Sequence, residues 1–154
     1  MAAEIEFADR SEKSALETGT GFAPKFGSDG LIPVVTQDAS SGDVLMVAYM
    51  NEEALRQTLE IKEAVYFSRS RSELWHKGAT SGHVQKVVEA RTDCDQDVIL
   101  LKVEQVGPGC CHAGYAACFY RKVPLGEEVA ATAKDGIAQL DLCEPQTYDP
   151  KKVY

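Results

Sequence analysis

Long apolar runs are absent from this sequence of 154 residues, and no stretch approaches the roughly 20 apolar residues of a membrane-spanning helix. The first ten residues, MAAEIEFADR, contain neither the basic region nor the apolar region of a secretion signal. A basic surplus is also absent, because the net charge is −8. Nucleic-acid binding usually requires a basic surface. We therefore expect a cytoplasmic protein with no nucleic-acid partner and no membrane partner.

Disulfide bonds are not expected either. The sequence has five cysteines, an odd number, and the cytoplasm keeps thiols reduced. Four of the five fall within the 25 residues from Cys94 to Cys118, and clustered cysteines in a reducing compartment are typically metal ligands or catalytic groups. Cys143 lies apart from the others, and we interpret it as incidental.

The length indicates one domain, which we divide into an N-terminal arm (1–30), a catalytic domain (31–123) and a C-terminal extension (124–154). The arm is polar and rich in glycine, so we expect it to be loosely held, with one short helix. Apolar and β-branched patterns then predict an α+β domain, mostly antiparallel β-structure with few helices. The expected elements are strands at 31–36, 44–50, 64–68, 84–91, 98–106 and 118–123, a helix from Asn51 to about Ile61, a polar loop over 69–82, and a short helix at 127–134.

Three aspartates alternate with other residues in the segment DCDQD, at Asp93, Asp95 and Asp97. In an extended segment side chains alternate between faces, so the carboxylates would share one face and Cys94 would occupy the other. Three carboxylates suit Mg²⁺, and a thiolate suits Zn²⁺. A solvated turn between strands is the alternative. An EF-hand is excluded, because Val98 stands where that loop requires glycine.

A second motif, GPGCCHAGYAAC, covers residues 107–118. A straight helix would separate Cys111 from Cys118 by about 10 Å, whereas sulfurs around one zinc ion lie roughly 3.8 Å apart. The glycines allow the chain to loop back and bring both thiolates to one ion. Buried free cysteines and redox chemistry are the alternatives. With Cys94 as a third ligand, zinc would keep an open position for water, and His112 would be free to transfer protons rather than act as a fourth ligand.

A third motif runs from Ser68 to His83 and combines basic side chains, hydroxyls and glycines. Such a segment is a plausible phosphate cradle, and Trp75 is placed to stack on a base. The alternative is an exposed basic loop that Trp75 anchors in the core. The candidate phosphate ligands are Arg69, Arg71, Lys77 and Ser81, and His83 is the second candidate for proton transfer after His112.

Together these segments resemble the phosphoribosyl-AMP cyclohydrolase family. The resemblance covers residues Leu31 to Lys122, in order: VAYMNEEAL, SRSR…LW-x-KG-x-TSGH-x-Q, DCD-x-D and CH-x-G…CFYR. It implies an intertwined homodimer with zinc at the subunit interface. Cys94 of one chain would then join Cys111 and Cys118 of the other, and Asp93, Asp95 and Asp97 would bind Mg²⁺.

The same resemblance implies the substrate and the reaction. The substrate would be phosphoribosyl-AMP, whose purine ring opens when hydroxide generated at zinc attacks C6 and the N1–C6 bond breaks. His112 would carry the proton from the attacking water to N1. The segment AGYAAC at 113–118 is less polar than is usual in the family. Two alternatives follow: a paralogous zinc hydrolase acting on another nitrogen heterocycle, and a non-catalytic binding module stapled by zinc.

Overall fold

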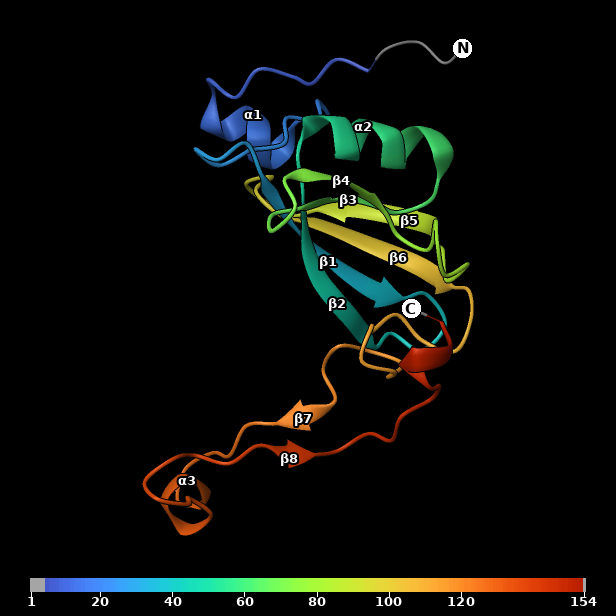
Figure 1. The fold of residues 1–154 in the computed structure, drawn as a ribbon. Helices are drawn as coiled ribbons and strands as arrows, with labels where there is room; N and C mark the ends of the chain where they lie inside the picture. Colours follow the sequence, from blue (N-terminus) through green and yellow to red (C-terminus); the bar gives the residue numbers. More distant parts are fainter. Residues whose placement is uncertain (1–4, 154) are drawn as a thin grey trace.

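The computed structural model describes residues 5–153, and its centre is a four-stranded sheet (Figure 1). The strand order is β2 (Val44–Met50), β1 (Ile32–Asp38), β6 (Ile99–Gln105) and β5 (Gln85–Thr92). β1 pairs in parallel with β6, and the other two pairings are antiparallel. The structure confirms an α+β fold with mostly antiparallel sheets and few helices.

One face of the sheet carries the core. Alternate residues of β1 and β6 are buried, and both strands therefore show the period-two pattern of a half-buried strand. α2 (Glu52–Ile61) and the hairpin of β3 (Val65–Ser68) and β4 (Glu73–His76) cover this face, as Figure 1 shows. Asn51 caps α2 as expected, because its side-chain oxygen accepts a hydrogen bond from the amide of Ala54 at 2.8 Å.

Two predicted elements differ from the structure. The polar loop expected over 69–82 contains β4, which pairs antiparallel with β3 from Ser68–Glu73 to Val65–His76. The strand expected over 118–123 is reduced to β7 (Arg121–Lys122), which pairs with β8 (Asp141–Leu142) rather than with the main sheet. The β4 segment has only four residues and follows a run of polar residues, so the sequence alone did not reveal the strand that pairs with β3.

The N-terminal arm is packed, contrary to the expectation of a loosely held segment. It contains α1 (Lys13–Thr18), and Phe7, Phe22 and Phe26 pack against the core. The rings of Phe7 and Phe22 meet edge to face with centroids 5.5 Å apart. Aromatic burial of this kind holds a polar segment in place although most of its residues remain exposed.

The chain leaves the body of the protein shortly before the C-terminal extension and returns to it at the end of the extension. β7, α3 (Glu128–Ala131) and β8 stand away from the main sheet in Figure 1, and several large apolar side chains there are exposed, including Phe119, Val123, Leu125 and Ile137. The chain then returns through a 3₁₀ helix at Pro150–Lys152. Within residues 5–153, none of the helices has the length and apolar character to cross a membrane.

A buried polar network crosses the core beneath the candidate site. The hydroxyl of Tyr66 lies 2.6 Å from that of Thr36 and donates to the side-chain oxygen of Gln85, also at 2.6 Å. Gln85 donates in turn to Gln105 at 3.0 Å. Burial raises the pKa of Tyr66, so this hydroxyl stays protonated and acts as a donor. The network ties β3 to β1, β5 and β6.

We predict that Tyr66→Phe destabilises the protein by about 1–3 kcal/mol, because it leaves the buried oxygen of Gln85 without its donor. The urea midpoint of unfolding measures the loss. Tyr49→Phe is the matched control, since among the described residues no hydrogen bond involves the Tyr49 hydroxyl. Equal midpoints for Tyr66→Phe and the wild type would contradict a stabilising role for the network.

Candidate active site

The segment from Asp93 to Asp97 is a tight turn between β5 and β6, not the extended segment expected from the sequence. The side-chain oxygen of Asp93 accepts hydrogen bonds from the amides of Asp97 and Val98 at 2.9 and 3.2 Å. Gln96 takes a left-handed conformation with φ of 58°. The turn nevertheless brings oxygens of Asp93, Asp95 and Asp97 within 4.8 Å of one another. This spacing suits a hard divalent cation.

The carboxylates of this turn perturb one another. The pKa of Asp97 is raised to about 6, because its carboxyl shares hydrogen bonds with the carboxylates of Asp93 and Asp95. Burial opposes ionisation of Asp93, but hydrogen bonds from the Asp97 side chain and from backbone amides outweigh it and hold the pKa of Asp93 low. Below about pH 6 the three adjacent carboxylates therefore share a proton that a bound cation would displace.

The N-terminal arm holds this turn in position. The side chain of Gln96 is buried; its oxygen accepts from the amide of Ala23 at 2.8 Å, and its nitrogen donates to the carbonyl of Leu16 at 3.1 Å. The guanidinium of Arg10 donates to the carbonyl of Asp95 at 2.8 Å. Sequence reasoning missed both residues, because neither carries a motif and their partners are distant in the sequence.

Three thiols lie together in the segment after β6. Cys110 and Cys111 are buried, and Cys118 is attached to β2 because its amide donates to the carbonyl of Leu45 at 2.7 Å. The amides of Cys110 and Cys111 donate to the carbonyls of Ala116 and Tyr115, which folds the segment back on itself. Gly109 is required here, since a Cβ at this position would collide with the Tyr115 carbonyl. The loop-back expected for Cys111 and Cys118 is thus present, and it also includes Cys110.

The thiols interact and differ in acidity. Hydrogen bonding to Cys110, together with burial, raises the pKa of Cys118. The same hydrogen bond from Cys118 lowers the pKa of Cys110. Burial raises the pKa of Cys111. The Cys110 sulfur also lies 3.4 Å from the carbonyl oxygen of Leu45 and packs in the core, which leaves Cys111 and Cys118 as the better pair of metal ligands.

Cys94 lies at the other end of the sheet from Cys111. It is exposed in the turn before β6, whereas Cys111 follows the end of β6. β6 has seven residues. A strand of this length extends roughly 24 Å, against the roughly 3.8 Å between sulfurs that share a zinc ion. One chain therefore does not bring Cys94 to Cys111 and Cys118.

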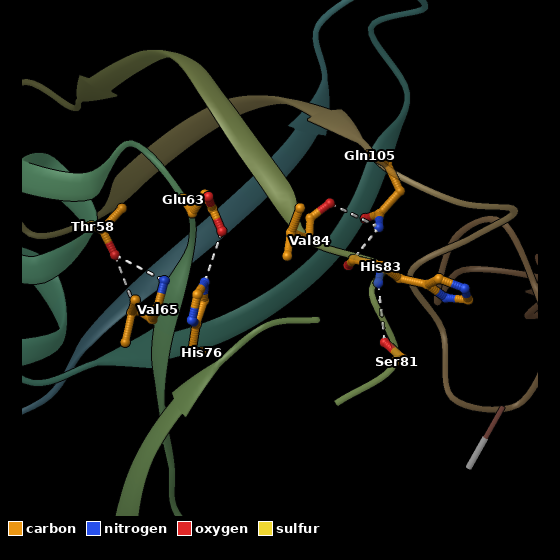
Figure 2. Close-up of polar contacts among 8 residues, drawn as sticks. All are labelled: Thr58, Glu63, Val65, His76, Ser81, His83, Val84 and Gln105. Carbon is orange, nitrogen blue, oxygen red and sulfur yellow. Dashed lines mark hydrogen bonds and ion pairs between the residues drawn. The ribbon is translucent and has the colours of Figure 1, made fainter. Parts of the chain in front are cut away.

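The histidines occupy different environments. His112 is exposed directly beside Cys111. His83 is 9% exposed, and Figure 2 shows its ring directed away from β5 toward the segment that follows β6. There it meets Gly107, whose ideal Cβ would lie 2.5 Å from the ring, and the edge of Tyr148. The side-chain amide of Gln105 donates to the backbone carbonyl of His83 at 3.0 Å (Figure 2). The ring of His76 pairs with the carboxylate of Glu63 at 2.9 Å.

The candidate phosphate ligands are dispersed. Arg69 and Trp75 line a cleft of about 390 Å³ between β2 and β3, where the Arg69 guanidinium lies 4.0 Å from the centre of the Tyr49 ring. Arg71 is exposed and forms an ion pair with Glu73 at 3.5 Å. The Ser81 hydroxyl accepts from the amide of His83 at 3.2 Å.

The position of Lys77 in the structure differs from the one that the sequence predicted for a phosphate ligand. Its side chain is 3% exposed and its ammonium donates to the carbonyl of Cys110 at 2.5 Å. A phosphate in solvent cannot reach a side chain buried to this extent, so the structure does not support Lys77 as a phosphate ligand.

The C-terminal extension also reaches the thiol segment, which the sequence did not indicate. The Tyr148 hydroxyl donates to the carbonyl of Cys111, and the amides of Thr147 and Tyr148 donate to the carbonyl of Gly114. Gly114 has φ of 93°, and an added Cβ would lie 2.6 Å from the Tyr148 carbonyl. The extension thus braces the turn that carries Cys111 and His112.

Comparison with known proteins shows which family this chain is similar to. The family model described as phosphoribosyl-AMP cyclohydrolase matches residues 46–120. Proteins named phosphoribosyl-AMP cyclohydrolase are similar over nearly their full length. The one from Nitratidesulfovibrio vulgaris (strain DP4) is 52% identical over 136 residues, covering 88% of this chain and 98% of that protein. The one from Nitrobacter hamburgensis is 51% identical over 144 residues, covering 94% and 93%.

We predict that the aspartate turn makes stability depend on pH when no divalent cation is present. The pKa of Asp97 rises from 3.8 to about 6 on folding, so the folded state binds more protons between these values. Its contribution to stability is full below pH 4 and is lost as the pH rises through 6. Asp97→Asn should therefore unfold near the wild-type temperature at pH 4 and at a higher temperature at pH 7.

Addition of Mg²⁺ at pH 7 should raise the unfolding temperature of the wild type more than that of Asp97→Asn, because the cation removes the repulsion. Asp141→Asn, which removes the same charge in β8, controls for net charge. Identical pH profiles for Asp97→Asn and the wild type would show that the three carboxylates do not interact as described.

Proposed function

The chain belongs to the phosphoribosyl-AMP cyclohydrolase family, and we propose that its catalytic centre is a zinc site shared between two copies of the chain. The activity is the cyclohydrolase step of histidine biosynthesis, in which water opens the purine ring of phosphoribosyl-AMP at the N1–C6 bond. The oxygen of water ends on C6, and N1 receives a proton. The relatives favour this activity over hydrolysis of another heterocycle and over a non-catalytic zinc-stapled module.

The observation that carries the zinc proposal is the convergence of thiols in the segment after β6. Soft sulfur donors suit Zn²⁺, and Cys111 and Cys118 interact with each other and lie beside an exposed histidine. When bound, zinc acts as a Lewis acid that makes a water molecule acidic enough to act as a nucleophile at neutral pH. Cys111 and Cys118 would hold it from one chain.

The third ligand supports a homodimer. Cys94 is exposed and lies a strand's length from Cys111, so the partner's Cys94 is the candidate to complete the site. The segment from 119 to 142, which includes the first part of the C-terminal extension, offers a surface for such a partner, with Phe119 57% and Leu125 78% exposed. Exposed apolar groups of this size typically mark protein–protein contacts. An intertwined homodimer would bury them and bring the two halves of each zinc site together.

His112 is the residue to which we assign proton transfer. It is exposed beside Cys111, where a substrate can reach it, and imidazole is the side chain that most often transfers protons in enzymes. His112 would accept a proton from the attacking water and return it to N1 as the ring opens. His83 remains the second candidate, but its ring is buried against Gly107 and Tyr148.

The remaining groups bind the rest of the substrate. The oxygens of Asp93, Asp95 and Asp97 would hold Mg²⁺, which neutralises their charge and offers a site for a phosphate. Arg69 and Arg71 would attract phosphates, and Trp75 would stack on the base from the same cleft that Arg69 lines. Ser81 would position the His83 segment. We place the enzyme in the cytoplasm, where the five free cysteines stay reduced.

The direct test of the function is turnover of phosphoribosyl-AMP by the purified protein. Zinc-loaded protein should convert it to the ring-opened imidazole product, which differs in ultraviolet absorbance. Removal of zinc with a chelator should abolish turnover, and addition of zinc should restore it. Failure of the zinc-loaded protein to open the ring would contradict the proposal.

We predict that Cys94→Ser and Cys118→Ser are each inactive and zinc-poor, because each removes one ligand from every site. In a mixed dimer of the two variants, one site lacks both Cys94 and Cys118, and the other site is intact. After random subunit exchange the mixture should recover roughly a quarter of the wild-type activity, because half of the dimers are mixed.

Cys143→Ser is the control and should keep full activity, since Cys143 is an exposed cysteine of the extension to which no ligand role is assigned. If the mixture of Cys94→Ser and Cys118→Ser stays inactive after verified exchange, the ligands do not come from two chains.

We predict that His112→Ala retains zinc while kcat falls by about 10²- to 10⁴-fold, the usual contribution of a general acid–base group. Zinc content and kcat are measured on the same preparation. His76→Gln serves as the histidine control, because His76 pairs with Glu63 away from the thiols. Loss of zinc from His112→Ala would identify it as a fourth ligand instead of a proton carrier.

A further inference from the structure

Lys77 carries a charge that the protein does not balance with a carboxylate. Its side chain is 3% exposed, and within residues 5–153 its ammonium takes part in no ion pair. The carbonyl of Cys110, at 2.5 Å, is the one acceptor with which it bonds in the described part of the chain. An ammonium has three donors, and a buried charge without a partner is costly.

The groups around Lys77 that can become anionic are the three thiols. The ammonium lies beside the segment that carries them, because the carbonyl it contacts belongs to Cys110, the neighbour of Cys111 in the chain, and both of these cysteines are buried with it. On the other side, Lys77 lies 5.1 Å from the centre of the Trp75 ring, whose face attracts cations but does not neutralise them. The nearest possible counter-charge is therefore the metal site.

We propose that Lys77 is a positioning residue that balances the charge of the zinc site, an inference that rests on the zinc site proposed above. Zinc with three thiolates carries a net charge of −1, and burial of that charge is unfavourable unless a cation lies beside it. Lys77 supplies this cation from the hairpin of β3 and β4, next to the backbone of Cys110.

A purely structural role predicts a different behaviour. If Lys77 serves only to brace the Cys110 carbonyl, its loss destabilises the protein whether or not metal is bound. If it balances the zinc site, its loss weakens zinc binding selectively. Replacement of an unbalanced buried charge by an apolar side chain of similar length is often neutral or stabilising, so the metal-free protein should not suffer.

The test compares Lys77→Met, Lys77→Gln and Lys77→Arg with the wild type. The Zn²⁺ dissociation constant is measured by competition with a chelator, and the urea midpoint is measured on metal-free protein. We expect the dissociation constant to rise about 10- to 100-fold in Lys77→Met, as for loss of one charge–charge interaction in a partly screened interior. Lys77→Arg keeps the charge and should stay within about threefold of the wild type.

Lys77→Gln separates the two roles if Lys77→Met does not fold, because it keeps a donor for the Cys110 carbonyl without the charge. The zinc dissociation constant of Lys77→Gln should also rise about 10- to 100-fold. Lys86→Met, on the exposed side of β5, controls for loss of a positive charge from the surface and should bind zinc like the wild type.

Wild-type zinc affinity in both Lys77→Met and Lys77→Gln would overturn the inference and leave the zinc site intact. So would a lower urea midpoint of the metal-free variants without a change in zinc affinity. Failure of the wild type itself to bind zinc would instead overturn the proposed zinc site, and this inference with it.

Discussion

The attachment of the thiol segment to β2 is the constraint on which the rest of the site depends. The carbonyl of Leu45 accepts from the amide of Cys118 and lies within reach of the Cys110 sulfur. Two further backbone bonds, from Cys110 and Cys111 to the carbonyls of Ala116 and Tyr115, close the segment on itself. Thiols that would be far apart on a helix therefore face one small volume, and His112 is exposed at its edge.

This arrangement divides the proposed centre between two ends of the sheet. β6 separates the aspartate turn with Cys94 from the segment with Cys111, so in the proposed homodimer each chain would contribute one half to each of two centres. Other segments stabilise each half. The N-terminal arm holds the aspartate turn through Gln96 and Arg10, and the C-terminal extension holds the turn of Cys111 through Tyr148. The two terminal segments thus serve the site although neither carries a catalytic motif.

The sequence predicted the parts of the structure that follow from local patterns. Apolar and β-branched patterns located β1 and β6, and the capping position of Asn51 located α2. The aspartate segment was different. The sequence predicted that the three carboxylates lie together, but on one face of an extended segment, whereas the structure brings them together in a turn. That turn needs the positive φ of Gln96 and partners from the arm, which lie more than 70 residues away in the sequence.

Lys77 shows the same limit. In a segment rich in basic residues and glycine it is indistinguishable from a phosphate ligand, and only the tertiary structure buries it beside Cys110. Strand β4 escaped prediction for a related reason, because its four residues form a strand only when paired with β3. Contacts with another segment of the chain, which the local pattern of a segment does not encode, decided each of these cases.

The measurement that tests the account most directly is the mass of the native protein with its metal. Native mass spectrometry of the zinc-loaded protein should show a dimer with two zinc ions, one for each chain, and zinc-free species among any monomers. A monomer that retains zinc would contradict the account, because it would mean that one chain closes the site without the partner's Cys94.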